Sequence, residues 1–116
     1  MRNKINDQAR LELILEAIDN IESFLADTES EDAFVADKIL CHAVAYNVQH
    51  IGECSYMLSR EFVTVNPEID WEAIEGLRHI LVHDYYRVRF QTIWRVYTDD
   101  IPVLKQWILD YLSCTK

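Results

Sequence analysis

The residues best suited to chemistry lie together in the stretch GLRHILVHDYYRVRF, from Gly76 to Phe90. Within it stand Arg78, His83 and Tyr85. A guanidinium group can stabilise negative charge on phosphoryl oxygens, and an imidazole can move a proton near neutral pH. Together these groups are suited to cleaving a phosphodiester without a metal ion.

Helical geometry limits how these side chains can meet. If one helix continues through the stretch, Arg78 and Tyr85, at i and i+7, share a face. His83 then points roughly 140° away from Arg78, at about 100° per residue. Either the helix unwinds near His83, or Arg78 meets the His83 of a symmetric copy across a two-fold axis. Spacing alone leaves both arrangements open.

Two other interpretations compete with catalysis. Arginine, histidine and tyrosine at a helix end also cap carbonyl groups and interact favourably with the helix dipole, and spacing alone favours this interpretation. His79 and His83, at i and i+4, could bind a metal ion, but Ile80 stands where a zinc protease would have glutamate. We therefore predict no metal site and no cofactor.

Charge is unevenly distributed along the chain. The formal net charge is -9, yet the segment from Gly76 to Arg95 holds four arginines and one aspartate. An acidic chain repels nucleic acid at long range, so this segment would have to hold any phosphate-bearing ligand locally. Arg87 and Arg89 are candidates to guide phosphate.

A polar strip precedes this segment. Gln49, His50 and Glu53 lie on one face of a predicted helix and are most simply a solvated strip. Alternatively, Glu53 could orient the arginine or histidine of the basic segment, as supporting carboxylates do in active sites.

The elements that must position these groups are all helical. Apolar residues at helical spacing predict helices over residues 7–25, about 31–60, about 71–81, 90–97 and 102–111. Thr28 and Glu31 have capping-box spacing, Asp70 is a good N-cap, and Gly52 would allow another helix to approach closely. We predict an all-α, up-and-down bundle of four to five helices.

Length and composition point to one domain spanning residues 1–116. The chain of 116 residues can bury one hydrophobic core, and its four glycines and prolines disfavour disorder and turn-rich β folds. No run of 18 apolar residues and no signal-peptide pattern occurs, so we expect a cytoplasmic protein with no membrane partner.

The cysteines and aromatic residues are assigned no chemistry. The three cysteines, Cys41, Cys54 and Cys114, are odd in number and form no CxxC pair, which favours buried thiols over disulfides or zinc. The remaining aromatic residues are expected in the core or a dimer seam rather than in a base-stacking platform: Trp94, Tyr97, Trp107 and Tyr111.

Three separated segments carry a resemblance to a known family. RHILVHDYY resembles the HEPN motif in its longer HepT form, which is Arg, four residues, His, one residue, Tyr. VQHIGECSYMLS resembles the second-helix segment of that family, and IWRVYTDDIPVLKQWI resembles its C-terminal region. The resemblance covers roughly residues 5 to 112 and places Arg78, His83 and Tyr85 on the family's motif.

The resemblance implies an all-α, symmetric homodimer with a composite active site in a cleft at the interface. Its members are commonly metal-independent endoribonucleases, in which His83 would be the acid or base and Arg78 would stabilise the pentacoordinate phosphate. The RNA substrate would be a tRNA or an mRNA. Glu53 matches the family's second-helix acid, and His79, which stands where Asn is frequent, could supply a second imidazole or a hydrogen-bond donor.

The resemblance also implies a partner. HepT-like proteins are usually paired with a small nucleotidyltransferase antitoxin of the MntA type, which transfers AMP to the motif tyrosine, here Tyr85. The first hypothesis is therefore the toxin of a type II toxin-antitoxin pair. A non-catalytic module that binds nucleotide or RNA beside a nucleotidyltransferase is the second, and a purely structural bundle is the third.

Overall fold

The structure, a computed structural model, describes residues 6–85 and 88–114. Within these ranges it contains helices and no strand, which confirms the predicted all-α class. No helix in this part of the chain is long and apolar enough to cross a membrane. The helices are α1 (Asp7–Phe24), α2 (Glu31–Ala36), α3 (Lys38–Tyr56), α4 (Arg60–Val65), α5 (Trp71–His83), α6 (Phe90–Arg95), a π-helical turn (Val96–Asp100) and α7 (Ile101–Cys114).

The single helix predicted from about residue 31 to residue 60 is wrong, because α2 and α3 both lie in this range and α4 begins at its end. Asp37 has an extended backbone, and its carboxylate accepts a hydrogen bond from the Leu40 N–H at 3.1 Å, so it caps α3. Ser59 caps α4 in the same way through the Phe62 N–H. Such caps satisfy amide groups that a helix start leaves unpaired, and they stabilise a new start over continuation.

The predicted capping box at Thr28 is also wrong. Ser30 is the N-cap of α2, and its hydroxyl accepts a hydrogen bond from the Ala33 N–H at 3.1 Å. The predicted cap at Asp70 is confirmed, since its carboxylate accepts from the Ala73 N–H at 3.0 Å.

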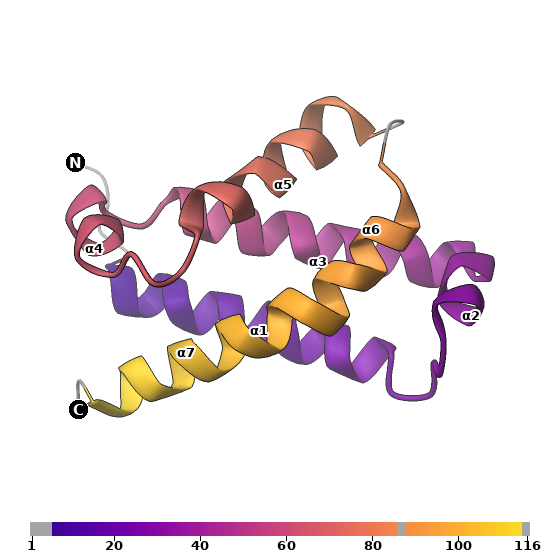
Figure 1. Ribbon diagram of the computed structural model, residues 1–116, viewed down its shortest axis with the longest axis horizontal. Coiled ribbons are helices and arrows are strands. Elements are labelled where there is room, and N and C mark those ends of the chain that lie inside the picture. Colours follow the sequence, from indigo (N-terminus) through magenta and orange to yellow (C-terminus); the bar gives the residue numbers. More distant parts are fainter. Residues whose placement is uncertain (1–5, 86–87, 115–116) are drawn as a thin grey trace.

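The helix α3 lies at the centre of the fold, between α1 and α5 (Figure 1). The apolar stripe predicted for the first helix is buried and packs into the core. The helix α7 also packs against α1. Burial of such side chains supplies most of the stability of a small helical domain. The buried residues of α1 and its C-cap are Leu11, Ile14, Ala17, Ile18, Ile21 and Leu25.

The two C-terminal helices predicted as separate elements form one continuous helical path. Figure 1 shows α6 running into α7, joined by the π-helical turn. At the end of this turn the Ile101 N–H bonds to the Val96 carbonyl, five residues back. Pro102 has no N–H to give to the usual acceptor four residues back, and a π turn accommodates such a gap without ending the helix.

Aromatic side chains fasten α4 and α7 to the start of α5. Trp107 and Tyr111 stack with ring centres 5.3 Å apart, and both meet the edge of the Phe62 ring. With Trp94 and Tyr97 they are partly buried against the core, as expected. Cys41 and Cys54 are buried free thiols, whereas Cys114 is exposed, against the expectation of burial.

Candidate active site

Close packing of α5 on α3 fixes the basic segment. Gly52 is buried in α3, and a Cβ atom added to it would lie 2.5 Å from the Arg78 Cβ and 3.0 Å from the Ile74 carbonyl oxygen. A larger residue at position 52 would therefore push α5 away. The predicted role of Gly52, a close approach by another helix, is confirmed.

Arg78 is held from two sides. Its Nε–H donates a hydrogen bond to the Glu53 carboxylate, with which it also forms an ion pair. Its Cζ lies 4.9 Å from the centre of the Tyr56 ring, a cation–π contact. The hydrogen bond with Glu53 raises the pKa of Arg78 above its already high ordinary value. The guanidinium is thus a permanent cation whose orientation is set by α3.

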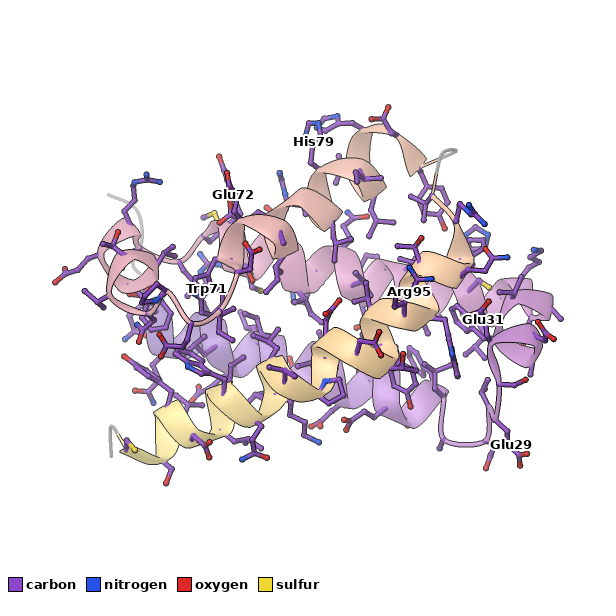
Figure 2. The ribbon with its side chains drawn as sticks, in the orientation of Figure 1. Glu29, Glu31, Trp71, Glu72, His79 and Arg95 are labelled. Atoms are coloured by element: carbon purple, nitrogen blue, oxygen red, sulfur yellow. The ribbon has the colours of Figure 1, made fainter. Side chains whose placement is uncertain are left out.

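Two imidazoles lie at the C-terminal end of α5. His79 and His83 are both exposed, with ring centres 4.7 Å apart, and Figure 2 shows His79 pointing outward from the helix. Over the described residues no third potential ligand joins them to form a metal-binding group. Asp84 ends the helix as its C-cap, with its N–H bonded to the Ile80 carbonyl at 2.8 Å. His83 therefore lies in the last turn, where solvent reaches its ring.

The predicted helical face shared by Arg78 and Tyr85 is wrong, because α5 ends before Tyr85. The backbone of Asp84 has φ -130° and ψ 40°, which is not helical. Tyr85 instead lies against α3, where its hydroxyl group is hydrogen-bonded to Nδ1 of His42. Because α5 continues through His83 and ends only at Asp84, the helix does not unwind so as to bring His83 to Arg78 within this chain. The meeting of Arg78 and His83 across a two-fold axis stays a prediction.

The Tyr85 hydroxyl group lies in a cluster of aromatic rings. The rings of Tyr85 and His42 are stacked with centres 5.6 Å apart, and Phe90 meets both rings at 5.4 and 6.5 Å. Burial raises the pKa of Tyr85, and nearby Cys41 raises it further. Tyr85 nevertheless keeps 37% of its surface exposed, so solvent reaches the side chain. Because its pKa is raised, the phenol is protonated at neutral pH.

The structure describes the other predicted supporting residues only in part. Arg89 is exposed at the start of α6, where it makes no side-chain cap. Arg87, like the neighbouring Tyr86, lies outside the described residues. His50 lies on α3 with its Nε2 3.8 Å from the Cys54 sulfur.

Sequence reasoning missed His42 and Tyr56, which contact two of the predicted residues. A signal was present, because polar and aromatic residues recur along α3 at alternating spacings of four and three and so share one face. This strip contains the predicted Gln49 and Glu53 and extends in both directions. Its members are His42, Tyr46, Gln49, Glu53 and Tyr56.

A cavity of about 500 Å³ lies between α3, α5 and the path from α6 to α7. Its walls are mostly apolar, with Arg95 and Asp100 among the lining residues. Arg78, His83 and Tyr85 do not line it. The cavity is therefore separate from Arg78, His83 and Tyr85, and we assign it no role in phosphate binding.

Comparison with known proteins places the sequence in a family. Residues 14–110 match the model of the family described as "Ribonuclease HepT-like". The chain is 38% identical over 95 residues to "Probable ribonuclease HepT" of Thermococcus cleftensis, covering 82% of this chain and 86% of that protein. No solved structure matches the sequence significantly.

Two further relatives carry similar names. The chain is 30% identical over 106 residues to "Putative RNase TTE0752" of Caldanaerobacter subterraneus subsp. tengcongensis, covering 91% of this chain and 94% of the relative. It is 29% identical over 93 residues to "Putative RNase MJ1380" of Methanocaldococcus jannaschii, covering 80% and 84%.

The all-α fold and the family match over residues 14–110 define a helical protein of the ribonuclease class. The chain belongs to the HepT-like ribonuclease family. The family and the enzyme class predicted from sequence are thus confirmed.

Proposed function

We propose that this protein is a toxin that cleaves RNA without a metal ion and is silenced by adenylylation of Tyr85. Its composite site combines Arg78 of one subunit with His83 of the other in a symmetric dimer. The nucleotidyltransferase that silences it would be an antitoxin of the MntA type. The proposal deepens the family assignment by giving named residues a role in the reaction.

The anchored guanidinium of Arg78 is the observation that supports this proposal most. In the described part of the chain, its hydrogen bond to Glu53 uses Nε, so the Nη atoms can still donate to phosphate oxygens. About a quarter of the side chain is exposed. A cation that is both fixed and accessible is suited to stabilise the charge that develops on a phosphorane.

His83 would provide proton transfer. Its imidazole takes the proton of the ribose 2′-hydroxyl as that oxygen attacks phosphorus, and the 5′-oxygen leaves with the electron pair of the broken P–O bond. The leaving oxygen then takes a proton from an imidazolium or from water. The requirement for a 2′-hydroxyl would confine the activity to RNA.

An exposed apolar side chain on α5 supports a symmetric dimer. Val82 lies between Arg78 and His83 around the helix, at about 100° per residue, and keeps 43% of its surface exposed. Packing of α5 against a second copy of itself on this side would cover Val82 and bring each Arg78 toward the other subunit's His83.

Silencing at Tyr85 is compatible with the partial exposure of this residue. An adenylyl group adds bulk and negative charge two residues beyond His83. In this position it would compete with the RNA phosphate for the cationic groups of the dimer. The test is intact mass after coexpression with a nucleotidyltransferase, followed by peptide mapping of the added AMP.

Incubation of the purified protein with tRNA and mRNA in EDTA tests the ribonuclease directly. The wild type is expected to release defined fragments, and His83→Ala to lose cleavage while remaining a folded dimer. His50→Ala is the matched control, because His50 lies on α3 beside Cys54. Cleavage by His83→Ala at the wild-type rate would remove His83 from the mechanism.

The acidic character of the chain favours a second candidate function. With a formal net charge of -9, the protein lacks the broad positive potential that speeds binding of non-specific RNA. A non-catalytic partner of a nucleotidyltransferase, which binds nucleotide or RNA, would bind the same RNAs saturably and yield no products.

A further inference from the structure

His42 and Tyr85 form a contact that joins two distant parts of the chain. His42 lies near the start of α3, 43 residues before Tyr85, and its Nδ1 is hydrogen-bonded to the Tyr85 hydroxyl group. The stacked rings fix the relative orientation, with 29° between their planes. Phe90 meets the His42 ring edge-on from α6. The imidazole is therefore held where it can exchange a proton with the phenol oxygen.

Lys38 and Cys41 are titratable groups of the described residues that adjoin this pair. Lys38 lies one turn before His42 on α3, with its Nζ 5.7 Å from the centre of the Phe90 ring. The Cys41 thiol is buried next to His42 in sequence, and its own pKa is raised by burial, so it is protonated. Among these groups, the imidazole alone is hydrogen-bonded to the phenol oxygen.

A tyrosine that attacks an electrophile must lose its phenolic proton. Because burial raises the pKa of Tyr85, the phenolate is scarcer at neutral pH than for a free tyrosine. A neighbouring base removes this obstacle by taking the proton during the attack. With its proton on Nε2, neutral His42 presents the lone pair of Nδ1 to the hydroxyl group.

We propose that His42 is the general base that activates Tyr85 for nucleotidyl transfer. The phenol oxygen attacks the α-phosphorus of a nucleoside triphosphate, and a new P–O bond forms. The bond from that phosphorus to the bridging oxygen breaks, and pyrophosphate leaves with the electron pair. The phenolic proton passes to Nδ1 of His42. This inference rests on the proposed modification of Tyr85, and it assigns part of that chemistry to the modified protein.

A small electrophile tests the base without a partner enzyme. An aryl sulfonyl fluoride reacts with tyrosine by forming an O–S bond and releasing fluoride. Tandem mass spectrometry of the digested protein then shows which tyrosine carries the label. Tyr46, one turn after His42 on α3 and 67% exposed, is the internal reference. Tyr85 is expected to label faster than Tyr46 although it is less exposed. Labelling of Tyr85 at or below the rate of Tyr46 would overturn the proposal.

Two substitutions separate a base from a positioning contact. His42→Asn keeps a hydrogen-bonding atom near the place of Nδ1 but cannot take the proton, and His42→Phe removes both functions. Both are expected to slow labelling of Tyr85 by about 10-fold or more, as loss of a general base does. His50→Asn should leave the rate unchanged. A His42→Asn variant that labels as fast as the wild type would reduce His42 to a positioning residue and refute the proposal.

Coexpression with a nucleotidyltransferase separates this inference from the proposed function. We expect the wild type to carry AMP on Tyr85 and the His42→Asn variant to acquire it at least 10-fold more slowly. Equal gain in both proteins would refute the role of His42 and leave the modification intact. If the wild type gains no AMP, the proposed modification is wrong, and the sulfonyl fluoride rates still decide whether His42 activates the phenol.

Discussion

Gly52 of α3 and Arg78 of α5 are packed so closely that a Cβ atom on the glycine would lie 2.5 Å from the Cβ of the arginine. Gly52 comes one residue before Glu53. The contact between Gly52 and Arg78 therefore sets how far the Glu53 carboxylate lies from the Arg78 guanidinium that it binds. The distance between α3 and α5 thus helps to position Arg78 in the candidate active site.

Replacement of Gly52 by Ala should lower the free energy of unfolding by about 1–2 kcal/mol. The cost of overpacking exceeds the roughly 1 kcal/mol that alanine gains over glycine inside a helix. Gly76→Ala is the matched control, because a Cβ atom there meets nothing within 4 Å, and it should stabilise by about 0.5–1 kcal/mol. Urea unfolding measures both. Equal stabilisation by the two substitutions would contradict the close contact.

Removal of Glu53 should affect RNA cleavage more than stability. The ion pair with Arg78 is partly exposed, so Glu53→Ala should change the free energy of unfolding by less than about 1 kcal/mol. Without its anchor the guanidinium is no longer oriented, and kcat/KM should fall by about 10- to 100-fold. Glu53→Gln, which keeps an oxygen acceptor, should lose less.

The control for this measurement is Glu72→Ala. Glu72 is exposed in the first turn of α5, the helix that also carries Arg78. Figure 2 shows it well apart from His79. Cleavage by this variant should match that of the wild type. A Glu53→Ala protein with unchanged kcat/KM would show that Arg78 does not depend on the carboxylate.

Asp100 should make stability depend on pH. Although Asp100 is exposed, partial desolvation raises its pKa above the ordinary value of 3.8, and the charge of Asp99 raises it further. The folded protein therefore holds the proton of Asp100 more tightly than the unfolded chain does. The stability gained from this tighter proton binding is fully present below pH 3.8 and is lost as pH rises through the pKa of Asp100 in the folded protein.

The variant Asp100→Asn tests that dependence. It should be more stable than the wild type near neutral pH, and the difference should shrink as acid protonates Asp100 in the wild type. Urea unfolding at several pH values measures it, with Asp27→Asn, an exposed residue in the turn after α1, as the control. A difference that does not vary with pH would assign the effect of Asp100 to packing.

The local signals in the sequence predicted much of the fold. The apolar stripe of α1 and the cap at Asp70 follow from side-chain periodicity and hydrogen-bonding chemistry near in sequence, and both are observed. The breaks at Asp37 and before Ser59 were missed because apolar spacing continues across them. A single capping carboxylate or hydroxyl decided the outcome there, and its effect of about 1 kcal/mol is small beside the pattern of a whole helix.

The candidate site was only partly predictable for a related reason. Glu53 could be proposed as a partner of the basic segment, and it contacts Arg78. The place of Tyr85 depends on where α5 ends, and its contact with His42 spans 43 residues. Periodicity along one helix carries no information about such a tertiary contact, so the extrapolation through Asp84 put Tyr85 on the wrong face.

Mixed dimers of Arg78→Ala and His83→Ala test the composite active site most directly. With differently tagged subunits purified as a mixed dimer, one of the two sites regains an intact Arg78 and an intact His83 from opposite subunits. We predict about half of the wild-type RNA cleavage per dimer, while each variant alone is inactive. A mixed dimer as inactive as its parents would contradict a site shared between subunits.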